Sequence, residues 1–303
     1  MSNLPVTRVP AGAIAIPDVK LEDLISELPA EVQELIGLYP NEWQRALDAL
    51  AANEDMVLTE AHVELVLIIL DDSTSIAEKR NAARAFCQAT RAFLKAFQTK
   101  NIVNAMVAVW TMNRRDPLRT STQLSQIRVP DDYPAEGHTP LIETMIAALF
   151  YQALLALWYK RVLRKLLGVE AFVGSTTVIF TDGEPSRDTP TPEPVRILAD
   201  YLQGLSRDPA NRARHIIIGV GVGRFGTFRS LFMAMGVYLS NIYTVNNFGK
   251  VQGELAAAGL RTVANALESG PQRVFALPGP TAPKPAHRSQ TGPRWRPRWP
   301  GGR

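Results

Sequence analysis

The sequence lacks most features that cross-link a chain or anchor it to a membrane. Its one cysteine, Cys87, excludes an intrachain disulfide and a zinc site built from several thiolates. The N-terminus lacks a basic segment followed by an apolar one, so no secretory signal is predicted. The one stretch that suggests a membrane span, at 144–159, is short and contains Gln152, which favours a buried helix. We therefore expect a cytoplasmic protein with no transmembrane segment.

Acidic residues are missing from the last twenty positions. Those positions hold six basic residues: Lys284, Arg288, Arg294, Arg296, Arg298 and Arg303. Setting them aside leaves 27 basic against 29 acidic residues, so the formal charge of +4 describes the C-terminal end and not the body. Residues 271–303 are rich in proline, arginine and tryptophan, and we expect them to form a disordered tail. Such a tail serves solubility, or contacts nucleic acid, an anionic membrane surface or a partner's groove.

Apolar strands alternate with helical patterns through the rest of the chain. Hydrophobic residues make up 46% of its 303 residues, enough to bury a sizeable core. Strands are predicted at 62–70, 101–112, near 119–128, and at 175–180, 214–222 and 242–247. Helices are predicted from 76 onward and at 140–167, 192–205, 227–235 and 249–268. This alternation predicts a doubly wound α/β fold: a mostly parallel, six-stranded sheet with helices on both faces.

The chain divides into three predicted parts. Residues 1–59 form an N-terminal extension with helices within 21–53, the last of them capped by Asn41. Residues 60–270 hold the alternating strands and helices, and 271–303 form the tail.

Oxygen-bearing side chains gather in three loops of the predicted sheet. Asp71, Ser73 and Ser75 follow the first strand, Thr139 precedes the long helix, and Asp182 follows the strand at 175–180. Ligands of doubly wound sheets bind at the carboxyl ends of the strands, so these loops are expected to meet. Two carboxylates and three hydroxyls suit Mg²⁺, and Mn²⁺ or Ca²⁺ as alternatives. The alternative is structural: either serine caps the following helix and Asp182 holds a turn.

These motifs, in this order, resemble the metal-ion-dependent adhesion site of von Willebrand factor A (vWA) domains. The matching residues are Asp71-x-Ser73-x-Ser75, Thr139 in a Gly-x-Thr-Pro-Leu loop, and Asp182 in Thr-Asp-Gly, and the resemblance spans about 60–268. It implies that the serines and the threonine contact the metal directly, and the aspartates directly or through water. The overall style is similar to intracellular prokaryotic members of the tellurium-resistance type.

Two positions depart from the usual pattern of that family. His138 stands where the family often has glycine, and Asp72 where it often has a small residue. His138 is expected to be an exposed loop residue or a partner contact. The negative charge of Asp72 is expected to lower affinity for an acidic ligand.

Other chemically suggestive residues have simpler interpretations. The stretch GVGRFG at 221–226 fits a dinucleotide fingerprint, but 209–253 contain no acidic residue to bind a ribose, so a close-packed strand end is preferred. Cys87 is expected in the core, and Glu184 and Asp188 in a solvated loop.

The resemblance implies a Mg²⁺-dependent interaction module, not an enzyme, in which a partner's Asp or Glu completes the metal shell. Such a module serves as an adaptor, regulatory or assembly protein, self-assembly included. One alternative is a metal-assisted phosphohydrolase using Asp72 or His138; against it, no lysine is expected near the three motifs, Lys79 being closest along the chain. A second alternative is a nucleic-acid-associated assembly protein that uses the basic tail.

Overall fold

The computed structural model describes residues 19–53, 62–99, 105–168, 170, 172–182, 190–207, 211–223, 225–251, 253 and 257–259. The predicted tail at 271–303 lies outside this part, as do Glu184 and Asp188. Of the predicted helix at 249–268, the described residues 249–251, 253 and 257–259 are helical.

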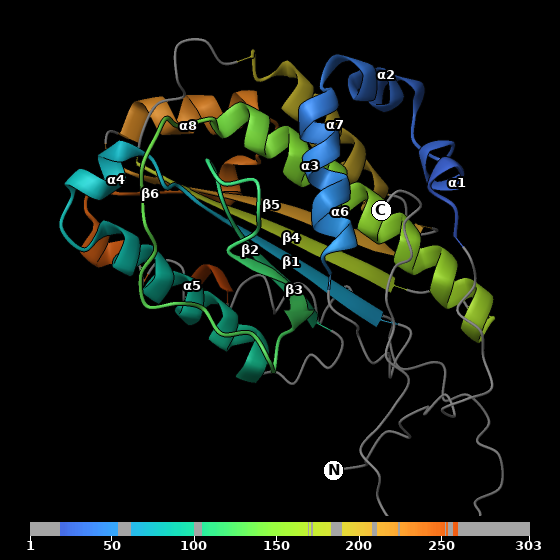
Figure 1. Cartoon of the computed structure of the whole chain (residues 1–303), viewed down its shortest axis with the longest axis horizontal. Coiled ribbons are helices and arrows are strands. Elements are labelled where there is room, and N and C mark those ends of the chain that lie inside the picture. Colours follow the sequence, from blue (N-terminus) through green and yellow to red (C-terminus); the bar gives the residue numbers. More distant parts are fainter. Residues whose placement is uncertain are drawn as a thin grey trace, which may run out of the picture.

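A six-stranded sheet forms the centre of the protein, with strand order β3-β2-β1-β4-β5-β6 (Figure 1). The strands are β1 (His62–Leu70), β2 (Ala105–Thr111), β3 (Arg119–Gln123), β4 (Phe172–Thr181), β5 (Ala213–Val222) and β6 (Ile242–Val245). All neighbours pair in parallel except β2 and β3. The central strands β1, β2 and β4 are almost wholly buried, as expected for strands covered on both faces. The predicted fold class is confirmed.

Helices cover both faces of this sheet. They are α1 (Leu21–Ile25), α2 (Ala30–Leu38), α3 (Pro40–Ala51), α4 (Thr74–Glu78), α5 (Ala82–Thr99), α6 (Leu141–Leu167), α7 (Glu193–Leu205) and α8 (Phe225–Ala234). One buried cluster joins the first face of β1 to α6, α7 and α8, and the other joins its second face to α4 and α5. The helices therefore form two layers with the sheet between them (Figure 1).

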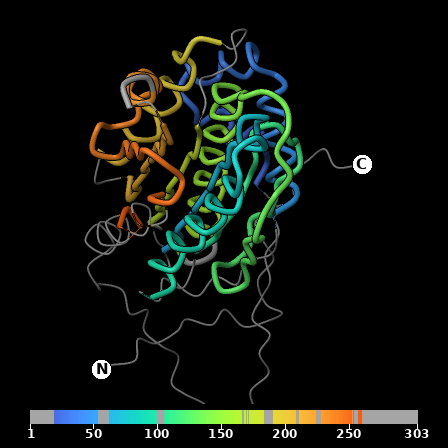
Figure 2. Tube along the Cα trace, turned by 90° about the vertical axis from the view of Figure 1, so that its left-hand side faces the viewer, coloured from blue at the N-terminus to red at the C-terminus, as the bar shows by residue number. Residues whose placement is uncertain are grey.

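The N-terminal helices share the core of the first layer. The ring of Trp43 in α3 meets Phe150 of α6 edge-on, with centroids 5.2 Å apart. Leu24 and Leu50 are completely buried in the same cluster. Figure 2 shows these helices, in blue, against the green helix α6. The prediction that Asn41 caps the last of them is wrong: α3 begins with Pro40, whose fixed φ suits a first helical position, and no side chain caps it.

Two helices replace the single one predicted from residue 76. The first, α4, begins at Thr74 and ends at Glu78, and α5 begins at Ala82. Between them Asn81 takes a left-handed φ of 65°. Asparagine tolerates this conformation better than most residues, which explains the break.

Helix α6 contains the apolar stretch seen in the sequence. By length and composition, Leu141–Lys165 is apolar enough to cross a membrane, but 89% of its most apolar window is buried inside the protein. The helix packs against α3 and α7 and against β1 and β4. This burial agrees with the predicted core helix.

The GVGRFG stretch and Cys87 have the structural roles predicted for them. A side chain at Gly221 would collide with the ring of Phe228 in α8, so this glycine allows the helix to pack closely on the strand. Cys87 is fully buried, and burial raises the pKa of its thiol to about 12. Cys87 is thus a core residue.

A buried ion pair crosses the sheet near the amino ends of its strands. Glu64 in β1 and Arg214 in β5 lie level with Gly174 in β4, and Arg214 Nη2 donates to Glu64 Oε2 over that glycine at 2.6 Å. His62 Nε2 lies 2.8 Å from Glu64 Oε1. Burial alone would raise the pKa of Glu64, but Arg214 and His62 outweigh it and hold this pKa below its usual value. Glu64 is therefore charged.

We expect the neighbouring His215 to steepen the loss of stability in acid. Its Nδ1 lies 2.6 Å from Ser175 Oγ, and burial, Lys160 and Arg214 lower its pKa to about 3. An unfolded histidine titrates near pH ~6.5, so between these values the unfolded chain binds the extra proton. Stability then falls with pH from about 6.5 downward by up to ~1.4 kcal/mol per unit.

Urea denaturation of the parent and of His215→Gln between pH 4 and 7 measures this contribution. The variant should show a shallower pH dependence by most of that slope. Equal slopes for the two proteins would contradict the assignment.

Candidate functional site

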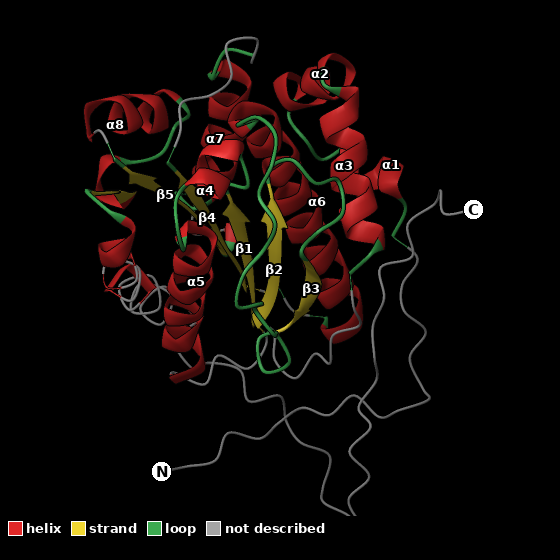
Figure 3. Cartoon of the chain, turned by 60° about the vertical axis from the view of Figure 1, so that its left-hand side comes forward, coloured by secondary structure: helices red, strands yellow, loops and turns green. Residues whose placement is uncertain are grey.

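The loops after β1 and β4 meet at the carboxyl ends of the strands. These two strands are neighbours, with Leu70 opposite Phe180, so the residues that follow them lie side by side. The N–H of Asp71 donates to the carbonyl oxygen of Phe180 at 3.0 Å. Figure 3 shows the arrowheads of β1 and β2 pointing toward the end of the sheet where α4 lies. This is the edge at which the predicted ligands were expected.

Asp71 directly follows the last residue of β1 and is completely buried. Its Oδ1 accepts the Ser73 N–H at 2.9 Å, and its Oδ2 accepts the Thr181 hydroxyl at 2.7 Å. Burial raises the pKa of Asp71, the hydrogen bonds from Ser73 and Thr181 partly oppose this, and the charge of Asp182 raises it further. The charge of Asp71 is thus only partly compensated by its hydrogen bonds, and perturbed carboxyl groups of this kind cluster at functional sites.

A chain of hydrogen bonds links three more predicted ligands. Ser73 Oγ lies 3.0 Å from Ser75 Oγ, and Ser75 Oγ donates to Asp182 Oδ1 at 2.7 Å. Ser73 occupies the N-cap position of α4, but its side chain makes no capping hydrogen bond. The capping alternative therefore does not explain the serines, because the Ser73 hydroxyl contacts Ser75 and the Ser75 hydroxyl donates to Asp182, not to the helix amides.

The threonine loop is fastened to the loop after β1 by its backbone. Glu136 N donates to the carbonyl of Asp72 at 2.6 Å, and Thr74 N donates to the carbonyl of Gly137 at 3.1 Å. Gly137 has a φ of 97°, which favours glycine. Thr139 is buried, with 8% of its surface exposed. His138 is exposed, in agreement with the prediction of an exposed loop residue. Thus the side chains of Ser73, Ser75 and Asp182 are joined to one another, Asp71 is joined to them through the Ser73 N–H, and Thr139 is held beside them through its loop.

Asp72 faces away from this cluster. Its Oδ1 accepts both the backbone N–H of Asn113 at 2.8 Å and the side-chain amide of Asn113 at 2.9 Å. The same amide donates to the carbonyl of His138 at 2.8 Å. Asp72 is therefore a structural support between loops, and its charge is directed away from the other oxygens.

The expectation of no lysine near the three motifs is wrong, because Lys79 lies against Asp182. Lys79 Nζ forms an ion pair with Asp182 Oδ2; the lysine side chain is 48% exposed and that of Asp182 is fully covered. Lys79 is distant from Asp182 in sequence, which hid the contact. The available signal was its spacing of four residues from Ser75, because residues four apart share one face of a helix.

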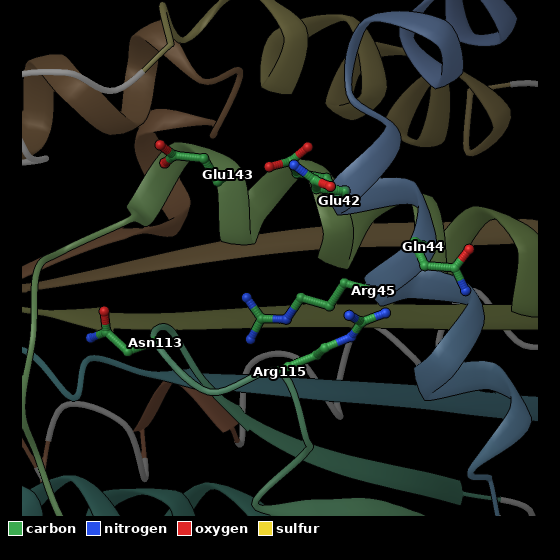
Figure 4. Close-up of a pocket in the computed structure, with 7 residues that line it drawn as sticks. Glu42, Gln44, Arg45, Asn113, Arg115 and Glu143 are labelled. Atoms are coloured by element: carbon green, nitrogen blue, oxygen red, sulfur yellow. The ribbon is translucent and has the colours of Figure 1, made fainter.

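A pocket of about 300 Å³ adjoins the site. Figure 4 shows its walls: Glu42, Gln44 and Arg45 from α3, Asn113 and Arg115 from the loop after β2, and Glu143 from the first turn of α6. Asn113 belongs to both the pocket and the support of Asp72.

Arg45 fastens the N-terminal helices to this end of the sheet. Its guanidinium donates to the carbonyls of Thr111, Met112 and Arg114 at 2.6, 3.1 and 2.8 Å. Burial lowers the pKa of Arg45 to about 10, although Asp72 and Glu42 oppose this, so it remains charged. Helix α3 is thus tied to the loop that holds Asp72.

The donor set fits a hard divalent cation. Asp71, Ser73, Ser75 and Asp182 offer only oxygen atoms, and hydrogen bonds already hold them together. Among the described residues, no group of three or more His, Cys, Asp or Glu side chains is placed to hold a metal. The proposed site does not form such a group, because only two of its five oxygen donors are carboxylates and the other three are hydroxyls. It is unlike the sites that soft metals select.

Comparisons with known proteins give similarity of structure and not of sequence. No protein-family profile and no curated protein matches the chain. A von Willebrand factor type A structure from Catenulispora acidiphila is similar at 13% identity and a TM-score of 0.41, covering 70% of this chain and 46% of that one. The ArnB paralog VWA2 from Sulfolobus acidocaldarius is similar at 15% identity and a TM-score of 0.39, covering 67% of this chain and 46% of that one.

A third similar structure is that of proximal thread matrix protein 1 from the mussel byssus, at 14% identity and a TM-score of 0.39. In that structure zinc occupies the metal-ion-dependent adhesion site (MIDAS) motif. That match covers 68% of this chain and 48% of the mussel protein. The chain thus spans about half the length of each of these structures.

Proposed function

We propose that this protein is a Mg²⁺-dependent protein-interaction module whose metal is held by Asp71, Ser73, Ser75, Thr139 and Asp182. The observation that carries the proposal is the hydrogen-bonded chain from Ser73 through Ser75 to Asp182, beside the buried Asp71. Mn²⁺ and Ca²⁺ suit the same oxygens. The vWA resemblance of the motifs supports the same conclusion.

A metal held by these residues would supply a positive centre for an acidic side chain of a partner. The protein's own residues prepare this: Ser73 N–H and Thr181 fix the Asp71 carboxylate, and Ser75 orients Asp182. Asn113 holds the charge of Asp72 away, which reduces repulsion of a partner's carboxylate. The partner is another protein or a second copy of this chain.

We further propose a cytoplasmic adaptor, regulatory or assembly role without catalysis. Lys79 removes one argument against a phosphohydrolase. The hydrogen bonds from Asn113 to Asp72, however, favour a supporting carboxylate over a nucleophile. Nucleic-acid binding through 271–303 remains a separate prediction.

Affinity capture from the native host tests the proposal. The tagged protein would be used in Mg²⁺ and in EDTA, beside Asp71→Ala and the control Asp200→Asn, which removes an exposed carboxylate on α7. We expect a partner retained by the parent and the control only in Mg²⁺, and lost with Asp71→Ala. Changing one Asp or Glu of that partner should also release it. A partner indifferent to EDTA and to Asp71 would overturn the proposal.

A further inference from the structure

We propose that Lys79 is a built-in cation that competes with the divalent metal for Asp182 and so sets the metal affinity of the site. The inference rests on the proposed metal site and adds a residue that weakens binding there. It comes from contacts that enclose the Asp182 carboxylate.

Both oxygens of Asp182 already have partners. Ser75 Oγ donates to Oδ1 at 2.7 Å, and Lys79 Nζ pairs with Oδ2. Ser75 lies in the first turn of α4, and Lys79 follows its last residue, so the same short helix presents both groups. Because the Asp182 side chain is fully covered, a metal that binds Oδ2 meets the Lys79 ammonium there, and the two cations compete for the same oxygen.

The charges make the ammonium and the metal alternatives. Asp71 and Asp182 are linked through Ser73 and Ser75, so two carboxylates repel each other within one small space. Lys79 offsets this repulsion by its ion pair, and a divalent cation at the same carboxylates would offset it more strongly. An ammonium and a metal ion on one carboxylate would repel each other, so binding of the metal favours release of the lysine.

The Lys79 ammonium can move into solvent when a metal displaces it from Asp182. Its side chain is 48% exposed, so the ammonium reaches water by a change of rotamer. Its Nζ lies 5.8 Å from the centroid of the Phe248 ring, which offers a second, weaker contact. Phe248 in turn packs on Phe86, with centroids 5.3 Å apart, which holds that ring in place.

The experiment is isothermal titration of Mg²⁺ and Mn²⁺ into the full chain and three variants. Lys79→Met keeps the length of the side chain and removes its charge, and Lys79→Arg keeps the charge. Arg80→Met is the matched control, because Arg80 is exposed and forms no ion pair with the described residues. Melting temperatures of all four in EDTA and in Mg²⁺ provide a second readout.

We expect Lys79→Met to bind both metals about tenfold more tightly, within the range typical of coupling between two ligands of one protein. Arg80→Met and Lys79→Arg should stay within about threefold of the parent. In EDTA, Lys79→Met should melt at a lower temperature, because Asp182 loses its counter-charge, and its gain on adding Mg²⁺ should be larger.

Unchanged or weaker metal binding by Lys79→Met, with normal binding by the parent, would overturn the inference and leave the metal site standing. Equal tightening by Arg80→Met would overturn it too, since general surface charge would then explain the effect. If neither the parent nor any variant binds metal, the proposed function and this inference both fail.

Discussion

Replacing Asp71 with asparagine is expected to abolish stabilisation by Mg²⁺ while leaving the metal-free protein at least as stable as the parent. Asparagine keeps an oxygen for the Ser73 N–H, so the loop retains its shape. It removes a charge whose burial is costly, as the raised pKa of Asp71 shows. A folded protein that raises the pKa of a carboxyl group favours its protonated form, so the parent loses stability as pH rises through that pKa.

The size of the effect follows from mass action. A ligand that binds only the folded state, at a concentration 100 times its dissociation constant, adds about 2.7 kcal/mol to the free energy of unfolding. The parent should gain an amount of this order in Mg²⁺ over EDTA at pH 7.5, and Asp71→Asn should gain almost none. Urea denaturation in the two buffers measures both values.

Asp72→Asn is the matched control, since it removes the same charge one residue away. Its carboxylate contacts Asn113, outside the oxygen cluster, so most of the Mg²⁺ gain should remain. A full Mg²⁺ gain in Asp71→Asn would show that the cation binds elsewhere.

Replacing Arg214 with methionine is expected to cost about 3–5 kcal/mol of stability, because it leaves the Glu64 charge buried without its main partner. Glu64 is completely buried, and the Arg214 side chain is only 7% exposed. His62 would still contact Glu64, but no longer with a permanent charge beside it. Urea unfolding at pH 7.5 measures the loss.

The double variant Glu64→Gln/Arg214→Met tests the cause. With both charges gone, most of the lost stability should return, because burying two neutral side chains of similar size avoids the cost of desolvation. If the double variant is as unstable as the single one, packing and not charge determines the loss. A single variant within about 1 kcal/mol of the parent would contradict the prediction outright.

The strands and most helices were predictable because their signal is local. The apolar run that became β1 was found with its observed bounds, His62–Leu70, since a strand buried on both faces needs little else. The break between α4 and α5 was missed because it depends on the left-handed Asn81, which no hydrophobic period records. Likewise, β4 begins at Phe172, three residues earlier than predicted, because Gly174 interrupts the apolar pattern of this buried strand.

For the candidate site, the sequence allowed a prediction of residue types but not of their arrangement. Asp71, Ser73, Ser75 and Asp182 were singled out because they follow recognisable strands, and their role as metal ligands stays a prediction. Lys79 on Asp182 and Arg45 on the end of β2 could not be found in this way, since each contact depends on how distant elements pack. Glu64 and Arg214 depend on the strand register, which places both beside one glycine.

Gly174 makes the residues at positions 64, 174 and 214 depend on one another. Any side chain at 174 would occupy the space of the Glu64 carboxylate, which His62 and Arg214 hold in place. An alanine at position 174 therefore requires replacement of Glu64. Without Glu64, the buried charge of Arg214 has no partner and destabilises the protein. Among natural relatives, we expect positions 64, 174 and 214 to change together or not at all, so their covariation should mark the boundary of the lineage that shares this core.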